Sequence, residues 1–149
     1  MSLLVVSHRK QQQQADCLAA CAAMVLDYLH IQVDYRRLLR ILRIRAYGAA
    51  FSNLHYLQAL GLRVEVHQGT FIALQGLLAQ GLPIIVAVDT SQLSYWSEET
   101  DHAVVVVGMD HDTVYVHDPD LSDGPQPIPM PEFELAWLEH DYRYAVISL

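Results

Sequence analysis

Residues 16–29 read Asp-Cys-Leu-Ala-Ala-Cys-Ala-Ala-Met-Val-Leu-Asp-Tyr-Leu, and this stretch decides the centre of the fold. Alanine and leucine favour helix, and Asp16 is a suitable cap because its carboxylate can accept hydrogen bonds from the free amides of a first turn. Apolar residues occur almost all the way round this helix, which is typical of a helix that is buried on every side. We therefore expect a central helix with Cys17 in its first turn.

Around this helix the hydrophobic period divides the chain into two halves. Further helices are predicted over residues 34–44, 53–60 and 71–80, the second of them capped by Ser52, with a strand over 63–67. Residues 83–88 and 103–109 are nearly continuous β-branched runs, as expected of strands buried on both faces, and 114–117 returns as the second strand of a hairpin. Short strands over 3–6 and 144–149, a proline-rich loop of little regular structure over 119–131 and a helix over 132–138 complete the prediction.

Helices followed by mostly antiparallel strands predict an α+β fold in which a helical half packs against a sheet half. The 149 residues suit a single domain, 1–149, since no internal repeat or linker interrupts them. A cleft between the two halves is the natural place for a binding site.

Charge and hydropathy exclude several classes of function. The net charge of −8 repels phosphate backbones, and the arginines between residues 36 and 45 alternate with leucine and isoleucine as on the wet face of a helix, so no nucleic-acid partner is expected. No stretch approaches the roughly 20 apolar residues of a membrane span, and the N-terminus lacks the order of a signal peptide. The two cysteines, four residues apart in one helix, fit free thiols in a reducing compartment. We expect a cytoplasmic protein.

Cys17 and His102 are the candidates for nucleophilic chemistry. A cysteine in the first turn of a helix lies where backbone amides and the helix dipole favour the thiolate, although two small buried cysteines would give the same pattern. His102 begins one strand of the predicted hairpin and Asp118 follows the other, so the hairpin should bring them together. A carboxylate there could fix the tautomer and orientation of the imidazole. Cys21, one turn deeper, is expected in the core.

Acyl transfer also needs donors for the oxyanion. The four glutamines at 11–14 lie just before Cys17, and one of their amides could act together with the Cys17 backbone N–H. The residues alone do not say which glutamine this is.

Taken together, these residues resemble the cysteine peptidases that process bacteriocin precursors, which are papain-like and usually form the N-terminal domain of peptide-exporting ABC transporters. The first motif of the family, Gln, five residues and Asp-Cys-Gly-x-Ala-Cys, is matched at Gln11, Asp16, Cys17, Ala20 and Cys21. Its histidine motif is matched by His102 to Gly108, and its Asp-Pro motif by Asp118-Pro119. The resemblance covers nearly the whole chain and selects Gln11 from the four glutamines.

The resemblance implies a papain-like peptidase without cofactor or metal. Cys17 is then the nucleophile, His102 the base, Asp118 the orienting residue and Gln11 the oxyanion donor. Cleavage would follow a Gly-Gly pair in the leader of a peptide or precursor-protein substrate. An ABC exporter, if one is involved, would be a separate protein.

Other functions remain open on the sequence. The family has glycine after the nucleophile, whereas this chain has Leu18, which favours a weak or inactive relative that binds leader peptides in the same cleft. Transglutamination or amidation would use the same acyl chemistry. A metal site is a weaker alternative, on the His and Asp residues near the hairpin: His111, Asp112, His117, Asp118 and Asp120. The loop with Tyr95 and Trp96 is more simply an ordinary surface connection than a cover for the cleft.

Overall fold

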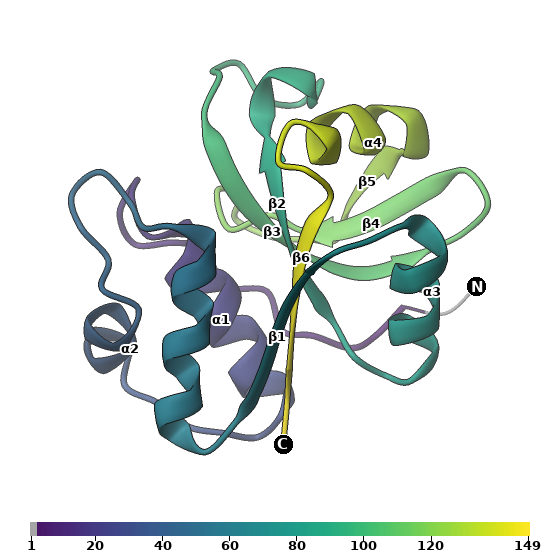
Figure 1. The fold of residues 1–149 in the computed structure, drawn as a ribbon. Coiled ribbons are helices and arrows are strands. Elements are labelled where there is room, and N and C mark those ends of the chain that lie inside the picture. The colour runs from purple at the N-terminus through teal and green to yellow at the C-terminus, as the bar shows by residue number, and fades with distance from the viewer. Residues whose placement is uncertain (1–2) are drawn as a thin grey trace.

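A computed structural model describes residues 3–149, and its two halves follow one another along the chain (Figure 1). The N-terminal half holds the helices α1 (Cys17–Tyr28) and α2 (Tyr35–Ile41) and the 3-10 helix η1 (Phe51–Leu60). The remaining elements are β1 (Arg63–Gln68), α3 (Phe71–Ala79), β2 (Ile84–Asp89), η2 (Thr90–Gln92), β3 (Asp101–Met109), β4 (Thr113–His117), β5 (Gln126–Pro129), α4 (Met130–Leu138) and β6 (Arg143–Ser148). The predicted α+β class is confirmed.

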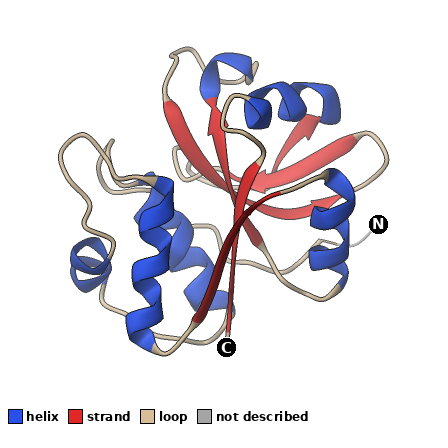
Figure 2. Cartoon of the chain, in the orientation of Figure 1, coloured by secondary structure: helices blue, strands red, loops and turns tan. Residues whose placement is uncertain are grey.

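The six strands form one antiparallel sheet in the order β1-β6-β2-β3-β4-β5. Helices cover both of its faces, with α1, α2 and η1 on one side and α3 and α4 on the other (Figure 2). The side chains of β3 alternate accordingly: Val105 and Val107 join the core around α1, whereas Val104 and Val106 join the core around α4. Burial on both faces explains why the central strands read as continuous apolar runs.

Helix α1 is the centre of the helical half, as its sequence predicts. Its residues from Leu18 to Leu26 are all buried, and it packs against β3. One prediction about this helix is wrong. Asp16 occupies the N-cap position, but its side chain makes no hydrogen bond to the first-turn amides. The carboxylate is bonded elsewhere, so it is not available as a cap.

The other helices show where local signals succeed and fail. Asp34 caps α2, accepting a hydrogen bond from the Arg37 amide, as expected. The helix ends at Ile41 rather than near 44 because Arg43 adopts a left-handed φ of 55° and the Ile44 amide bonds back to the Leu39 carbonyl. The prediction that Ser52 caps the next helix is wrong: η1 begins at Phe51, so Ser52 lies inside the helix.

Two expectations outside the helices are also wrong. Residues 3–6 form no strand, although the Leu4 amide bonds to the Val107 carbonyl beside the bulge of β3. The proline-rich segment contains β5, which pairs with β4. Prolines are tolerated there because β5 is at the edge of the sheet, while Ile128 between them is fully buried.

Over residues 3–149, no helix has the length and apolarity that crossing a membrane requires.

Truncating a buried leucine of the helical half should destabilise the fold far more than truncating a surface leucine. Leu54 of η1 is fully buried, whereas Leu135 of α4 is 51% exposed. We expect Leu54→Ala to lower the free energy of unfolding by about 2–5 kcal/mol, because the deletion leaves a cavity. Leu135→Ala, the same chemical change, should cost less than about 1 kcal/mol. Urea denaturation of both variants measures the difference; equal losses would contradict the packing described for η1.

Candidate active site

Cys17 is the first residue of α1, so its thiol lies at the positive end of the helix dipole. The residue is only partly buried, whereas Cys21, one turn further, is completely buried. Burial is the main cause that raises the pKa of the Cys21 thiol well above its usual value, followed by the neighbouring Cys17 and Asp118. Of the two thiols, therefore, Cys17 is the accessible one and Cys21 belongs to the core, as expected.

The hairpin of β3 and β4 brings His102 and Asp118 into contact. His102 is the second residue of β3, and Asp118 directly follows β4. The imidazole Nε2 lies 2.7 Å from Asp118 Oδ1, and both side chains are almost completely buried. Because Nε2 is occupied by the carboxylate, Nδ1 is the ring nitrogen left to act on the Cys17 side chain, with which His102 also interacts.

Asp118 is held by more donors than the sequence suggests. Its Oδ2 accepts hydrogen bonds from the Tyr95 hydroxyl at 2.6 Å and from Trp96 Nε1 at 2.9 Å, and its Oδ1 also accepts from the Asp120 amide at 2.9 Å. The Trp96 ring lies edge-on to the His102 ring with centroids 4.8 Å apart. Interpreting this loop as an ordinary surface connection was therefore wrong. The adjacent Tyr-Trp pair just before the histidine motif was the available signal.

These contacts shift the pKa values of His102 and Asp118 in opposite directions. Burial alone lowers the pKa of His102, but the hydrogen bonds to Asp118 and Cys17 and their negative charge outweigh it and raise the pKa to about 9. Burial alone raises the pKa of Asp118, and the donors His102, Tyr95 and Trp96 together lower it below its usual value. At neutral pH the pair is thus an imidazolium against a carboxylate.

Gln11 is the most shielded of the four glutamines: it is half-buried, while 12–14 are exposed. Its backbone amide bonds to the carbonyl of Pro119, next to Asp118. Its side-chain Nε2 donates to the carbonyls of Gln13 and Gln14, at 2.9 and 3.0 Å. Among residues 3–149, no hydrogen bond joins Gln11 to Cys17, so the oxyanion role assigned to Gln11 stays a prediction.

Two adjoining hollows open on either side of His102. One, of about 430 Å³, is lined by Gln11, Trp96 and the glutamines, and the other, of about 390 Å³, by Cys17, Gly48 and Ala87. Both hollows are lined by His102 and also by Gln14, Thr100 and Asp101. Each has the size of an ordinary ligand site, and Cys17 lines the second of them.

Leu18 does not close this cleft. It borders the hollow at Cys17, but only 4% of its surface is exposed and its side chain belongs to the core around α1. Cys17 itself stays partly accessible. The leucine is thus accommodated inside the protein rather than over the nucleophile.

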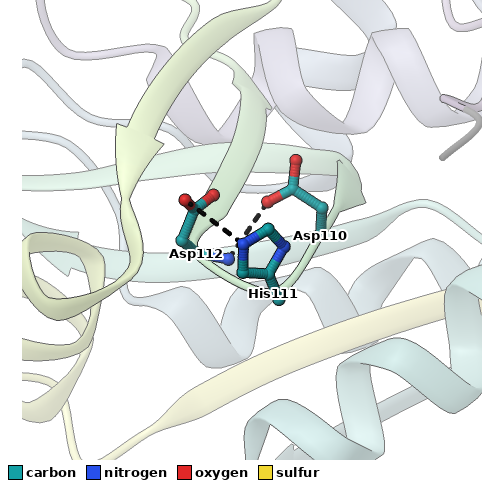
Figure 3. A group of neighbouring side chains, drawn as sticks. All are labelled: Asp110, His111 and Asp112. Carbon is teal, nitrogen blue, oxygen red and sulfur yellow. Dashed lines mark hydrogen bonds and ion pairs between the residues drawn. The ribbon is translucent and has the colours of Figure 1, made fainter.

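The possible metal ligands near the hairpin do not assemble as the sequence suggested. Within residues 3–149, the cluster with suitable spacing is Asp110, His111 and Asp112, all from the β3–β4 turn (Figure 3). Asp110 is already bonded to the amides of Asp112 and Thr113. Asp118 is engaged with His102, and His117 Nε2 bonds to the Val6 carbonyl. The contacts of Asp110 are those of a tight turn, and Asp118 serves the imidazole of His102.

The pairing of Cys17 with His102 predicts a distinctive alkylation profile. Because the pKa of His102 is raised to about 9, the imidazolium that accompanies a thiolate persists across neutral pH. The positive charge of this imidazolium favours the thiolate of the neighbouring Cys17, so alkylation of Cys17 by iodoacetamide at neutral pH should be faster in wild type than in His102→Ala. In His102→Ala the rate should be slower at pH 6 and rise about tenfold per pH unit, as for an ordinary thiol. Mass spectrometry gives both rates; identical profiles would refute the pair.

The donors to Asp118 predict a stability effect. Tyr95→Phe removes the hydroxyl that donates to Asp118 Oδ2, which leaves a buried carboxylate with one partner fewer. We expect a loss of about 1–3 kcal/mol in the free energy of unfolding. Tyr47→Phe is the matched control, since Tyr47 is 88% exposed, and it should be neutral. Equal stabilities of the two variants in urea would argue against this network.

Comparisons with known proteins show the family and the fold of the chain. Residues 6–140 match the model of the Peptidase C39 family. A search of curated protein sequences gave no match. Similar solved structures include a C39-like peptidase from Bacillus anthracis, with 16% identity, coverage of 100% of this chain and 98% of the other, and a TM-score of 0.82.

Two further structures are peptidase domains linked to transporters. The peptidase domain of Streptococcus ComA, described as a bifunctional ABC transporter of a quorum-sensing pathway, has 17% identity, coverage of 97% and 98%, and a TM-score of 0.79. A double glycine motif protease from an AMS/PCAT transporter, solved in complex with the leader peptide, has 21% identity, coverage of 99% and 94%, and a TM-score of 0.77. At these identities the structures establish the fold, and the match over 6–140 establishes the family: the chain belongs to the Peptidase C39 family of papain-like cysteine peptidases.

Proposed function

We propose that this protein cleaves a leader from a precursor peptide, after a pair of small residues of the Gly-Gly type, with Cys17 as nucleophile. The observation that carries the proposal is the buried His102–Asp118 pair beside the partly exposed thiol at the start of α1. The leader-peptide complex of the related protease supports the class of substrate.

The chemistry follows from the positions of the groups. The proton of Cys17 is held on His102 Nδ1, so the thiolate faces an imidazolium and attacks the carbonyl carbon of the scissile bond. The Cys17 backbone amide and the Gln11 side chain stabilise the oxyanion, with Gln11 exchanging one of its loop bonds for this purpose. As the carbon–nitrogen bond breaks, His102 transfers its proton to the leaving amine. Water then attacks the thioester, its proton passes to His102, and the leader leaves with a new carboxylate while the thiolate is regenerated.

Asp118 acts on this cycle through His102. Its hydrogen bond at Nε2 holds the ring so that Nδ1 faces the thiol, and its charge stabilises the imidazolium. The cycle requires no metal or cofactor. We place the reaction in the cytoplasm, where thiols stay reduced, and expect a peptide-exporting ABC transporter to take up the product.

A set of fluorogenic peptides that carry a Gly-Gly pair, with an Ala-Ala and a Leu-Leu control, tests the proposal. Wild type should cleave the Gly-Gly peptide after the second glycine, and Cys17→Ala should be inactive. Asp118→Asn should lower kcat by at least about 100-fold because the imidazole loses its orienting charge.

The alternatives give different results in the same assay. Binding of the Gly-Gly peptide by wild type without cleavage would overturn the proposal in favour of a leader-binding protein. Added hydroxylamine separates acyl transfer from hydrolysis: a hydroxamate product formed in place of the acid, with little product in its absence, would identify a transferase.

A further inference from the structure

The role of Asp16 is unexplained by the proposed mechanism. Its side chain is 1% exposed, although a carboxylate at an N-cap position ordinarily faces solvent and the helix amides. Here Oδ1 accepts a hydrogen bond from the Gln13 amide at 2.8 Å, and Oδ2 accepts one from the Tyr35 hydroxyl at 2.7 Å. Burying a carboxylate is costly unless such partners are provided. These two bonds therefore compensate for the burial of Asp16, and they are the contacts through which it acts.

The first bond fixes the glutamine loop. Gln13, which Asp16 holds by its amide, also accepts a hydrogen bond from Gln11 Nε2 through its carbonyl. The Gln11 side chain therefore rests on the segment that Asp16 anchors. The other end of the loop is tied by the bond from the Gln11 amide to Pro119. Release of Asp16 would loosen the loop at the point that supports the Gln11 amide group.

The second bond connects the loop to α2. Tyr35 is the first residue of α2, and its hydroxyl reaches across to Asp16. Burial, followed by the hydrogen bond and the charge of Asp16, raises the pKa of Tyr35 above its usual value, so its hydroxyl stays a donor at any physiological pH. The guanidinium of Arg9, which pairs with Asp27, lies 5.6 Å from the centre of the Tyr35 ring. The Asp16 carboxylate is thus held at Oδ1 by the Gln13 amide and at Oδ2 by the Tyr35 hydroxyl.

The orientation of Asp16 has a consequence for the thiol as well. A capping carboxylate would occupy first-turn amides and bring a negative charge beside them. Because Asp16 is turned toward Gln13 and Tyr35 instead, its carboxylate makes no bond to the first-turn amides of α1, where the reaction needs donors for an anion.

We propose that Asp16 and Tyr35 are positioning residues that hold the glutamine loop so that Gln11 can stabilise the oxyanion. This inference rests on the proposed function only for its effect on turnover; the anchoring of the loop is independent of it. The effect should appear in kcat rather than in the reactivity of the thiol, because neither residue contacts His102 or Asp118 by a hydrogen bond.

Kinetics on the Gly-Gly peptide test the inference with Asp16→Ala and Tyr35→Phe. Each should lower kcat by about 10- to 100-fold, approaching the loss of one oxyanion donor, while KM and the alkylation rate of Cys17 at pH 7 stay within about twofold. Asp16→Asn should recover most of the activity, since an amide can accept from Gln13 and donate to the Tyr35 oxygen. Asp34→Ala is the matched control: Asp34 is exposed and bonds to the Arg37 amide, so its loss should leave kcat unchanged.

A double-mutant cycle with Gln11→Ala decides whether the residues act through Gln11. Asp16→Ala should cost little further in the Gln11→Ala background. A full additional loss, an unchanged kcat in both single variants, or a parallel fall in Cys17 alkylation would overturn the inference.

Hydrogen exchange separates a failure of this inference from a failure of the proposed function. Followed by mass spectrometry over residues 9–18, exchange should be faster in Asp16→Ala than in wild type or Asp34→Ala, whether or not the protein cleaves peptides. Unchanged exchange would refute the anchoring by itself. An inactive wild type with faster exchange in Asp16→Ala would refute the peptidase proposal but not the anchoring.

Discussion

The packing of α1 against β3 is the constraint on which the site depends, because it places a helix terminus beside the beginning of a strand. Ala19, Ala20 and Ala22 are all fully buried, and their small side chains let the helix lie close to its neighbours. Residues of both elements share one apolar core, which includes Val105 and Val107 of β3. Cys17 and His102 need no long loops to meet, since each sits at the end of an element that this core holds rigidly.

The site also requires a buried carboxylate whose two oxygens both accept hydrogen bonds. An unpaired charge in the interior would cost several kcal/mol, so Asp118 is tolerable only because His102, Tyr95, Trp96 and the Asp120 amide all donate to it. These donors come from three separate parts of the chain: the loop after η2, β3 and the turn after β4. The carboxylate therefore organises the walls of the cleft as well as the imidazole.

Asp16 and Asp118 are comparable in this respect. Each is almost completely buried: Asp16 directly precedes α1, which begins at Cys17, and Asp118 directly follows β4, the strand that pairs with the one carrying His102. One connects the glutamine loop to α2, and the other connects His102 to the Tyr95–Trp96 loop. Both break the ordinary preference for exposed aspartates, and such exceptions to local rules are expected at functional sites, where tertiary contacts compensate for them.

The amino-acid sequence by itself determined the α+β class, the buried central helix and the hairpin that joins His102 to Asp118, because these follow from the period of apolar residues and from turn chemistry along short stretches. Motif spacing was sufficient to indicate the family. Only the tertiary structure decided which way the Asp16 carboxylate points, what Tyr95 and Trp96 bind, and that Leu18 packs inside rather than over the thiol. β5 among the prolines became visible only there too, since its regularity comes from pairing with β4. The reason is the same in each case: the partner lies far away in the chain, so no local pattern encodes the contact.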